Sequence, residues 1–151
     1  MNTNALIILL FATFVATSSA VNIQNCGGSA SVNLNGIQIT GCKPNIRRCI
    51  FVRGQDADMA LPFTTNVQVT AVTAKVTGIV SFIPIPFNLP NSNGCVNSGL
   101  QCPLEPQQPQ TYSASLPVLK SYPSIPVLVQ WELLDQNNNK LVCIKFPVQL
   151  K

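Results

Sequence analysis

The chain has 151 residues, no histidine and a formal net charge of +4 at pH 7. A charge of this size is too small to indicate a nucleic-acid-binding protein, and the missing histidine excludes Ser-His and Cys-His catalysis. Charged residues make up only 9% of the chain and hydrophobic residues 46%, so we expect a polar but mostly uncharged surface around a large apolar interior.

The first 20 residues, MNTNALIILLFATFVATSSA, predict a secretory signal peptide. An apolar run precedes small residues, with Ser18 and Ala20 at the minus-three and minus-one positions of a cleavage site. The run is too short to cross a bilayer as a helix. We therefore expect cleavage after Ala20, leaving residues 21–151 as one domain that is secreted (extracellular) or delivered to the endosomal or lysosomal lumen.

The remaining chain contains six cysteines, and an even number behind a signal peptide predicts three disulfides. Two pairs lie close in sequence with a turn between them, which leaves the first and last cysteines to join the two ends of the chain. The expected disulfides are Cys26–Cys143, Cys42–Cys49 and Cys95–Cys102. The metal-binding alternative lacks both histidine and CxxC-like spacing, so we expect no metal.

Alternating apolar and polar residues predict β-strands along most of the mature chain. Residues 57–71 alternate with a period of two, and residues 124–134 and 141–150 each place apolar side chains on one face. The Asn35-Gly36 pair is a strong signal for a hairpin turn or bulge. No stretch beyond the signal peptide shows a helical period of 3.6, so we predict an all-β sandwich of about seven strands.

Residues 82–102, FIPIPFNLPNSNGCVNSGLQC, alternate apolar residues with prolines and end between two cysteines. Prolines cannot donate the hydrogen bonds of a central strand, so the segment is an edge strand or a loop. Exposing its apolar side chains forgoes roughly 1.5 to 3 kcal/mol for each one that could be buried. It is therefore either a proline-rich segment that packs well or is gripped by another domain, or the wall of a hydrophobic ligand pocket, with Ile85 and Phe87 as candidates.

Three groups of residues, read together, resemble the ML lipid-recognition family. They are PIPFNLPNSNGC at 84–95, LPV and YPSI at 116–118 and 122–125, and WELLDQNNNKLVCIKFPV at 131–148. The resemblance covers Cys26 to Lys151 and is strongest to the secreted sterol carriers of the family; mite group 2 allergens are further relatives. It implies an immunoglobulin-like β-sandwich with three disulfides and an internal lipid pocket between its sheets.

The resemblance also implies which residues line the pocket. Carried over by motif, they are Phe87, Val118, Tyr122 and Pro123. Trp131 lies on the apolar face of its strand and is interpreted as core first and pocket wall second. The family usually has an aromatic residue where this chain has Ile144, which leaves open whether the pocket takes a sterol or a slimmer fatty acid.

Two functions are compatible with the sequence. One is a carrier that binds a sterol or fatty-acid-like lipid and transfers it, through transient contact, to a membrane surface or a membrane sterol transporter. The other is a recognition module in innate immunity or chemical signalling that presents a microbial lipid, fatty acid or semiochemical to a receptor. For both we expect a monomer that has no enzyme activity and no cofactor and binds no nucleic acid.

The sequence contains one basic cluster, Lys43, Arg47, Arg48 and Arg53. It is either solvated surface or a contact for anionic membrane headgroups or a protein partner.

Overall fold

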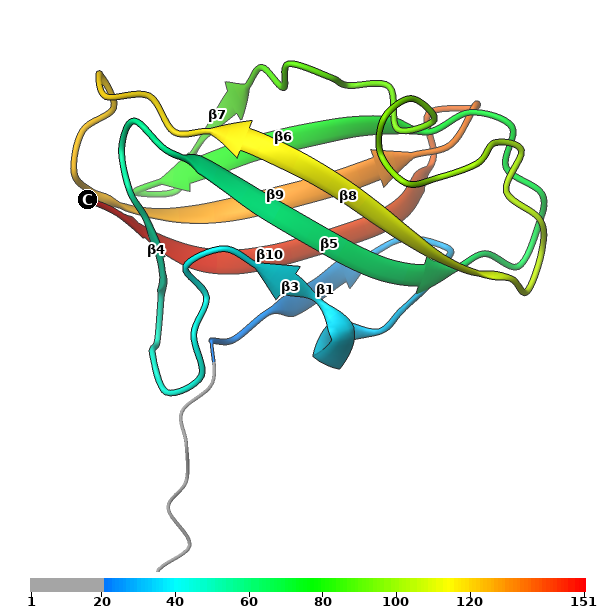
Figure 1. Ribbon diagram of the computed structural model, residues 1–151, viewed down its shortest axis with the longest axis horizontal. Coiled ribbons are helices and arrows are strands. Elements are labelled where there is room, and N and C mark those ends of the chain that lie inside the picture. The colour runs from blue at the N-terminus through cyan, green and yellow to red at the C-terminus, as the bar shows by residue number, and fades with distance from the viewer. Residues whose placement is uncertain (1–20) are drawn as a thin grey trace, which may run out of the picture.

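Residues 21–151 form ten β-strands and a short 3₁₀ helix in this computed structural model (Figure 1). The predicted signal peptide lies outside these described residues. In chain order the elements are β1 (Gln24–Gly27), β2 (Ser31–Val32), the helix η1 (Leu34–Gly36), β3 (Gln38–Ile39), β4 (Cys49–Phe51), β5 (Asp56–Thr64), β6 (Thr73–Val80), β7 (Ile83–Phe87), β8 (Pro109–Pro117), β9 (Pro126–Leu134) and β10 (Lys140–Leu150). Seven strands have four or more residues, in line with the sequence; the other three are too short to show an alternating pattern.

The strands form two sheets that pack face to face (Figure 1). The larger sheet has the order β1-β10-β9-β6-β7, and β4 joins it by pairing in parallel with β10. In the smaller sheet β5 pairs with β8 along one side and with β2 and β3 along the other. The predicted all-β, immunoglobulin-like sandwich is confirmed. None of the helical structure in residues 21–151 is long and apolar enough to span a membrane.

The core lies between the sheets because apolar side chains occur at every second position. In β9 the buried apolar residues are Val127, Val129, Trp131 and Leu133. They lie next to buried residues of β10, where Ile144 pairs with Trp131 and Phe146 with Val129. Burying each such side chain contributes roughly 1.5 to 3 kcal/mol, so the facing apolar surfaces hold the two sheets together.

Three disulfides stabilise the sandwich, and their pairing is the predicted one. They are Cys26–Cys143, Cys42–Cys49 and Cys95–Cys102. Strict alternation places Cys143 on the face of β10 opposite its core residues. Its partner Cys26 comes from β1, which pairs with β10 at that position, and the bond therefore joins the amino-terminal strand to the carboxy-terminal one.

The Asn35-Gly36 pair does not form the hairpin that its sequence favours. Both β2 and β3 pair with β5 and are connected by η1. A type I′ hairpin turn needs positive φ at both central residues, and neither Asn35 nor Gly36 has it. Instead the side-chain Oδ1 of Asn33 accepts a hydrogen bond from the Gly36 N–H at 3.2 Å. Pairing with the long strand β5 thus overrides the local turn signal.

The proline segment begins as an edge strand, as predicted. Strand β7 is the last strand of the larger sheet and pairs with β6, with Phe87 opposite Val76. Only every second N–H of an antiparallel edge strand is needed for the ladder. Pro84 and Pro86 can therefore occupy the alternate positions without loss of hydrogen bonds.

The apolar side chains of this segment are covered only at its inner end. Phe82, at the turn before β7, is 96% exposed, and exposure falls to 62% at Ile83 and 45% at Ile85. Phe87 is half-buried and packs against the core. By alternation Ile83, Ile85 and Phe87 share one face of β7. The expectation that the whole segment covers apolar surface is therefore correct for Phe87 and wrong for its tip.

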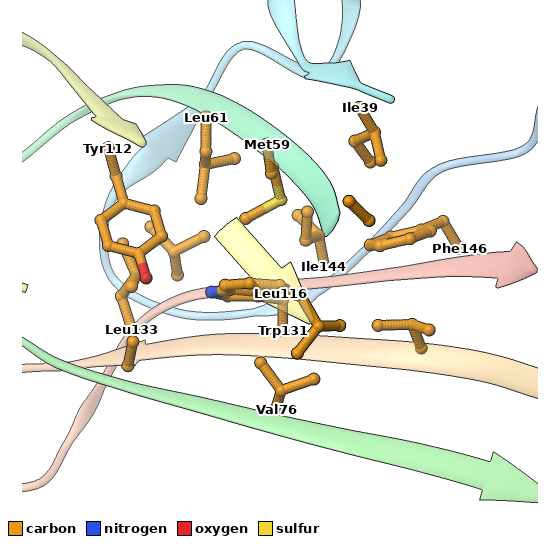
Figure 2. Packing of buried hydrophobic residues seen from close by; sticks show 14 of the residues in the cluster. Ile39, Met59, Leu61, Val76, Tyr112, Leu116, Trp131, Leu133, Ile144 and Phe146 are labelled. Carbon is orange, nitrogen blue, oxygen red and sulfur yellow. The ribbon is translucent and has the colours of Figure 1, made fainter. Parts of the chain in front are cut away.

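Trp131 lies at the centre of the core, beside Tyr112 of β8 (Figure 2). The two rings meet edge to face, with centroids 6.2 Å apart and planes at 62°. Burial raises the pKa of Tyr112 to about 12. The indole Nε1 of Trp131 has no hydrogen-bond acceptor within the described residues.

The raised pKa of Tyr112 predicts a late tyrosine titration. The chain has two tyrosines, so Tyr122→Phe leaves Tyr112 as the sole reporter, and its absorbance change at alkaline pH should centre near 12. Because folding favours the neutral phenol, its contribution to stability is complete below pH 10 and is lost as pH rises toward 12. A midpoint near 10, with the fold intact by circular dichroism, would show that the phenol is hydrated.

Candidate functional site

An apolar cavity lies between the two sheets. Its wall includes the end of β8 and the start of β9, which lie near the carboxy terminus (Figure 1). The larger sheet contributes Phe51, Val76, Phe87, Val127, Val129 and Leu150 to its wall. Strand β8 and the loop that follows it contribute Leu116, Pro117, Val118 and Tyr122. No wall residue carries a charge, so the cavity suits a hydrocarbon group and not an ionic one.

The cavity measures about 20 Å³, which is little more than the space of one water molecule. Binding sites for small organic ligands occupy roughly 300 to 1,000 Å³. A lipid could therefore enter only if the two sheets separate. They can do so along one seam, because β7 pairs with β6 and β8 pairs with β5, each at the edge of its own sheet.

Two aromatic side chains close this seam. Phe87 of β7 and Tyr122 of the β8–β9 loop meet edge to face, with ring centroids 5.5 Å apart and planes at 80°. Both are half-buried. An edge-to-face pair contributes roughly 0.5 to 1.5 kcal/mol, a small barrier to opening. The adjacent prolines, Pro86 and Pro123, restrict the backbone on either side, so the rings are held at low entropic cost.

The opposite side of the cavity is held by the β4–β5 loop. The N–H of Gly54 donates to the carbonyl of Val118 at 2.5 Å, and the N–H of Val118 donates to the carbonyl of Gln55 at 3.0 Å. The Arg53 guanidinium Nη1 donates to the carbonyl oxygen of Tyr122 at 3.0 Å. These bonds fix the backbone of two cavity residues, and none of them involves β7.

The structure brings together three of the residues expected to bind lipid: Phe87, Val118 and Tyr122. Pro123 is exposed and does not line the cavity. Ile85 is exposed on the same face of β7 as Phe87, one step nearer the tip. Trp131 is only 2% exposed and belongs to the core, outside the cavity wall.

Sequence reasoning missed Gly78 of β6, which faces the ring of Phe87. A Cβ at this position would clash with that ring and would lie 3.2 Å from Cγ1 of Val127. The absence of a side chain therefore makes room for Phe87 inside the sandwich. A glycine within a strand pattern is a known sign of such close approach, and this was the available signal.

The close fit at Gly78 predicts a measurable clash. Gly78→Ala should lower the unfolding free energy by about 1 to 3 kcal/mol, because the added methyl overpacks the site against Phe87. Combining it with Phe87→Leu removes the far end of the ring and should recover much of that loss. Urea unfolding of the two single variants and the double variant measures this coupling. Strictly additive effects would show that the methyl group is accommodated elsewhere.

Together the fold and the cavity define a disulfide-bonded immunoglobulin-like sandwich with an apolar site at its open seam. The family model described as ML domain matches residues 20–150, and the chain belongs to this family. The resemblance read from the sequence motifs is thus confirmed.

Relatives span nearly the whole chain. The chain is 36% identical over 144 residues to NPC intracellular cholesterol transporter 2 homolog a of Drosophila melanogaster, covering 95% of this chain and 97% of that protein. It is 36% identical over 136 residues to NPC intracellular cholesterol transporter 2 of Bos taurus, covering 90% and 89%. Among solved structures, a Niemann-Pick type C2 protein from Japanese carpenter ant superposes with a TM-score of 0.80 at 28% identity, covering 86% of this chain and 99% of that one.

Proposed function

We propose that this protein is a secreted or luminal lipid carrier that takes a sterol or similar hydrophobic lipid between its two sheets and transfers it to a membrane or a membrane transporter. The observation that carries the proposal is the uncharged cavity at the seam between β7 and β8, where Phe87 and Tyr122 meet edge to face. Relatives named as cholesterol transporters, at 36% identity over most of the chain, support it.

The energetics of such binding are favourable. A lipid that hides roughly 500 Å² of apolar surface gains about 12 kcal/mol, and association offsets about 4 kcal/mol or more. The remaining 8 kcal/mol or so corresponds to a dissociation constant near one micromolar. Separating the sheets subtracts from this, because opening breaks the Phe87–Tyr122 contact and some of the apolar contact between the sheets.

The exposed tip of β7 offers an entry path. Phe82, Ile83 and Ile85 form an apolar strip that leads from the turn before β7 toward Phe87. A lipid leaving a bilayer could follow this strip without crossing water. The basic residues Lys43, Arg47 and Arg48 are exposed on the β3–β4 loop, where they can attract anionic headgroups, whereas Arg53 is turned toward Tyr122.

The test is a titration of delipidated, folded protein with a fluorescent sterol and a fluorescent fatty acid, followed by transfer to vesicles. A carrier should bind one of them saturably near micromolar concentration and release it to acceptor vesicles within the assay. Tight binding without release would instead favour a recognition module. Absence of saturable binding to either probe would exclude both functions.

A further inference from the structure

The guanidinium of Arg53, at the cavity end of the sandwich, has a buried N–H without an acceptor in the described residues. Arg53 is partly buried, and its guanidinium Nη1 bonds to the carbonyl of Tyr122, a residue of the cavity wall. Its Nε is buried and has no hydrogen-bond partner within residues 21–151. In the same part of the chain the single ion pair joins Lys140 to Glu132, so no described carboxylate lies within ion-pair distance of the Arg53 guanidinium; the carbonyl oxygen of the last residue, Lys151, accepts from the Arg53 backbone N–H at 2.7 Å.

A guanidinium in this state is suited to an incoming anion. It is charged at every accessible pH and carries five N–H donors in a planar fork that matches a carboxylate. A buried N–H without an acceptor destabilises the protein, and the penalty is larger on a charged group. A carboxylate that arrives with the ligand would relieve this penalty. Lys120 adds positive charge here, because its side chain packs against Gly54, the residue after Arg53.

The size of the cavity narrows the class of ligand further. A single hydrocarbon chain is slimmer than a fused-ring sterol and needs less separation of the sheets. The free space between them is only about 20 Å³, and the wider the sheets must open, the more van der Waals attraction between them is given up. A ligand with a single hydrocarbon chain, which requires the smaller separation of the sheets, is therefore favoured over a sterol.

We propose that Arg53 is the counter-ion for an acidic head group, and that the preferred cargo is a long-chain carboxylic acid. The hydrocarbon chain of the acid lies between Phe87, Val118 and Tyr122. The carboxylate of the acid meets the Arg53 guanidinium at the point where the guanidinium borders Tyr122. This inference rests on the proposed carrier function and adds the chemistry of the head group. Arg53 is thus a specificity residue that distinguishes an acid from a neutral lipid of the same length.

The experiment compares cis-parinaric acid with its methyl ester, two fluorescent probes that differ only in the charged head. Wild-type protein should bind the acid at least tenfold more tightly than the ester at low ionic strength. Arg53→Gln, whose amide can still donate to the Tyr122 carbonyl, should lower affinity for the acid to that for the ester. Lys75→Gln removes the same charge from an exposed position on β6 and should leave the tenfold preference in place.

Each outcome separates this inference from the carrier function. If wild-type protein binds neither probe but binds the fluorescent sterol, the carrier function stands and the acid cargo is overturned; if it binds none of the three, the carrier function itself fails. If wild-type protein binds acid and ester equally, the carrier function stands and the role of Arg53 is overturned. This outcome is measured on the wild-type protein, so it does not depend on whether a variant folds. If Arg53→Gln weakens both probes alike, the residue only supports the wall through Tyr122. If Lys75→Gln abolishes the preference as well, long-range charge and not Arg53 selects the acid.

Discussion

Replacing Phe87 with alanine is expected to weaken lipid binding tenfold or more while destabilising the fold only moderately. The ring is half-buried at the seam, and losing roughly 60 Å² of apolar surface shared with a lipid removes about 1.5 kcal/mol of binding free energy. A fully buried phenylalanine costs about 3 to 5 kcal/mol when truncated, and Phe87, being only half-buried, should cost about 1 to 2. Tyr122→Ala should behave in the same way, because it closes the other side of the seam.

The control is Phe63→Ala on β5, since Phe63 is buried in the core and lies outside the cavity wall. It should cost about 3 to 5 kcal/mol of stability and leave the affinity of the folded fraction unchanged. Thermal unfolding of the lipid-free variants and lipid titration of the same samples supply both quantities. A large loss of melting temperature in Phe87→Ala, with unchanged affinity, would make Phe87 a packing residue and place the binding site elsewhere.

The fold was largely predictable because its core depends on a two-residue period. The strands β5, β9 and β10 show this period over nine or more residues, long enough for the buried face to be identified. Two of the disulfides followed from proximity along the chain, and the third, Cys26–Cys143, from the two cysteines that remained. The pairing of the shortest strands was not predicted, because a two-residue strand such as β2 or β3 has no period of its own that would identify β5 as its partner.

The binding site was less predictable, because cavity walls and core walls use the same side chains. Trp131 and Phe87 are both aromatic residues on apolar strand faces; the prolines beside Phe87 indicated an edge, but only the finished sandwich shows that Phe87 lines the cavity and Trp131 does not. Gly78 makes room in the cavity wall only because the Phe87 ring faces it, and the sequence does not show which ring a glycine faces. Arg53 appeared as one member of a basic cluster, and only its bond to the Tyr122 carbonyl distinguishes it from the exposed arginines.

Removing the Cys26–Cys143 disulfide is expected to lower the unfolding free energy by about 4 to 5 kcal/mol. The two residues are 117 positions apart, and in the chain-entropy model a cross-link that closes so long a loop strongly restricts the unfolded chain. Cys143 is also fully buried, so alanine at this position packs less well against its neighbours. The double variant Cys26→Ala/Cys143→Ala, unfolded in urea, measures the loss of stability.

The matched control is Cys95→Ala/Cys102→Ala, which opens a loop with a separation of only 7 residues and should cost roughly 2 to 3 kcal/mol. The long loop carries a second signature: without its cross-link the unfolded chain expands, and the urea dependence of the unfolding free energy should become steeper. Equal losses of stability in the two double variants, with unchanged urea dependence, would show that the disulfides act through the native state and not by restricting the unfolded chain.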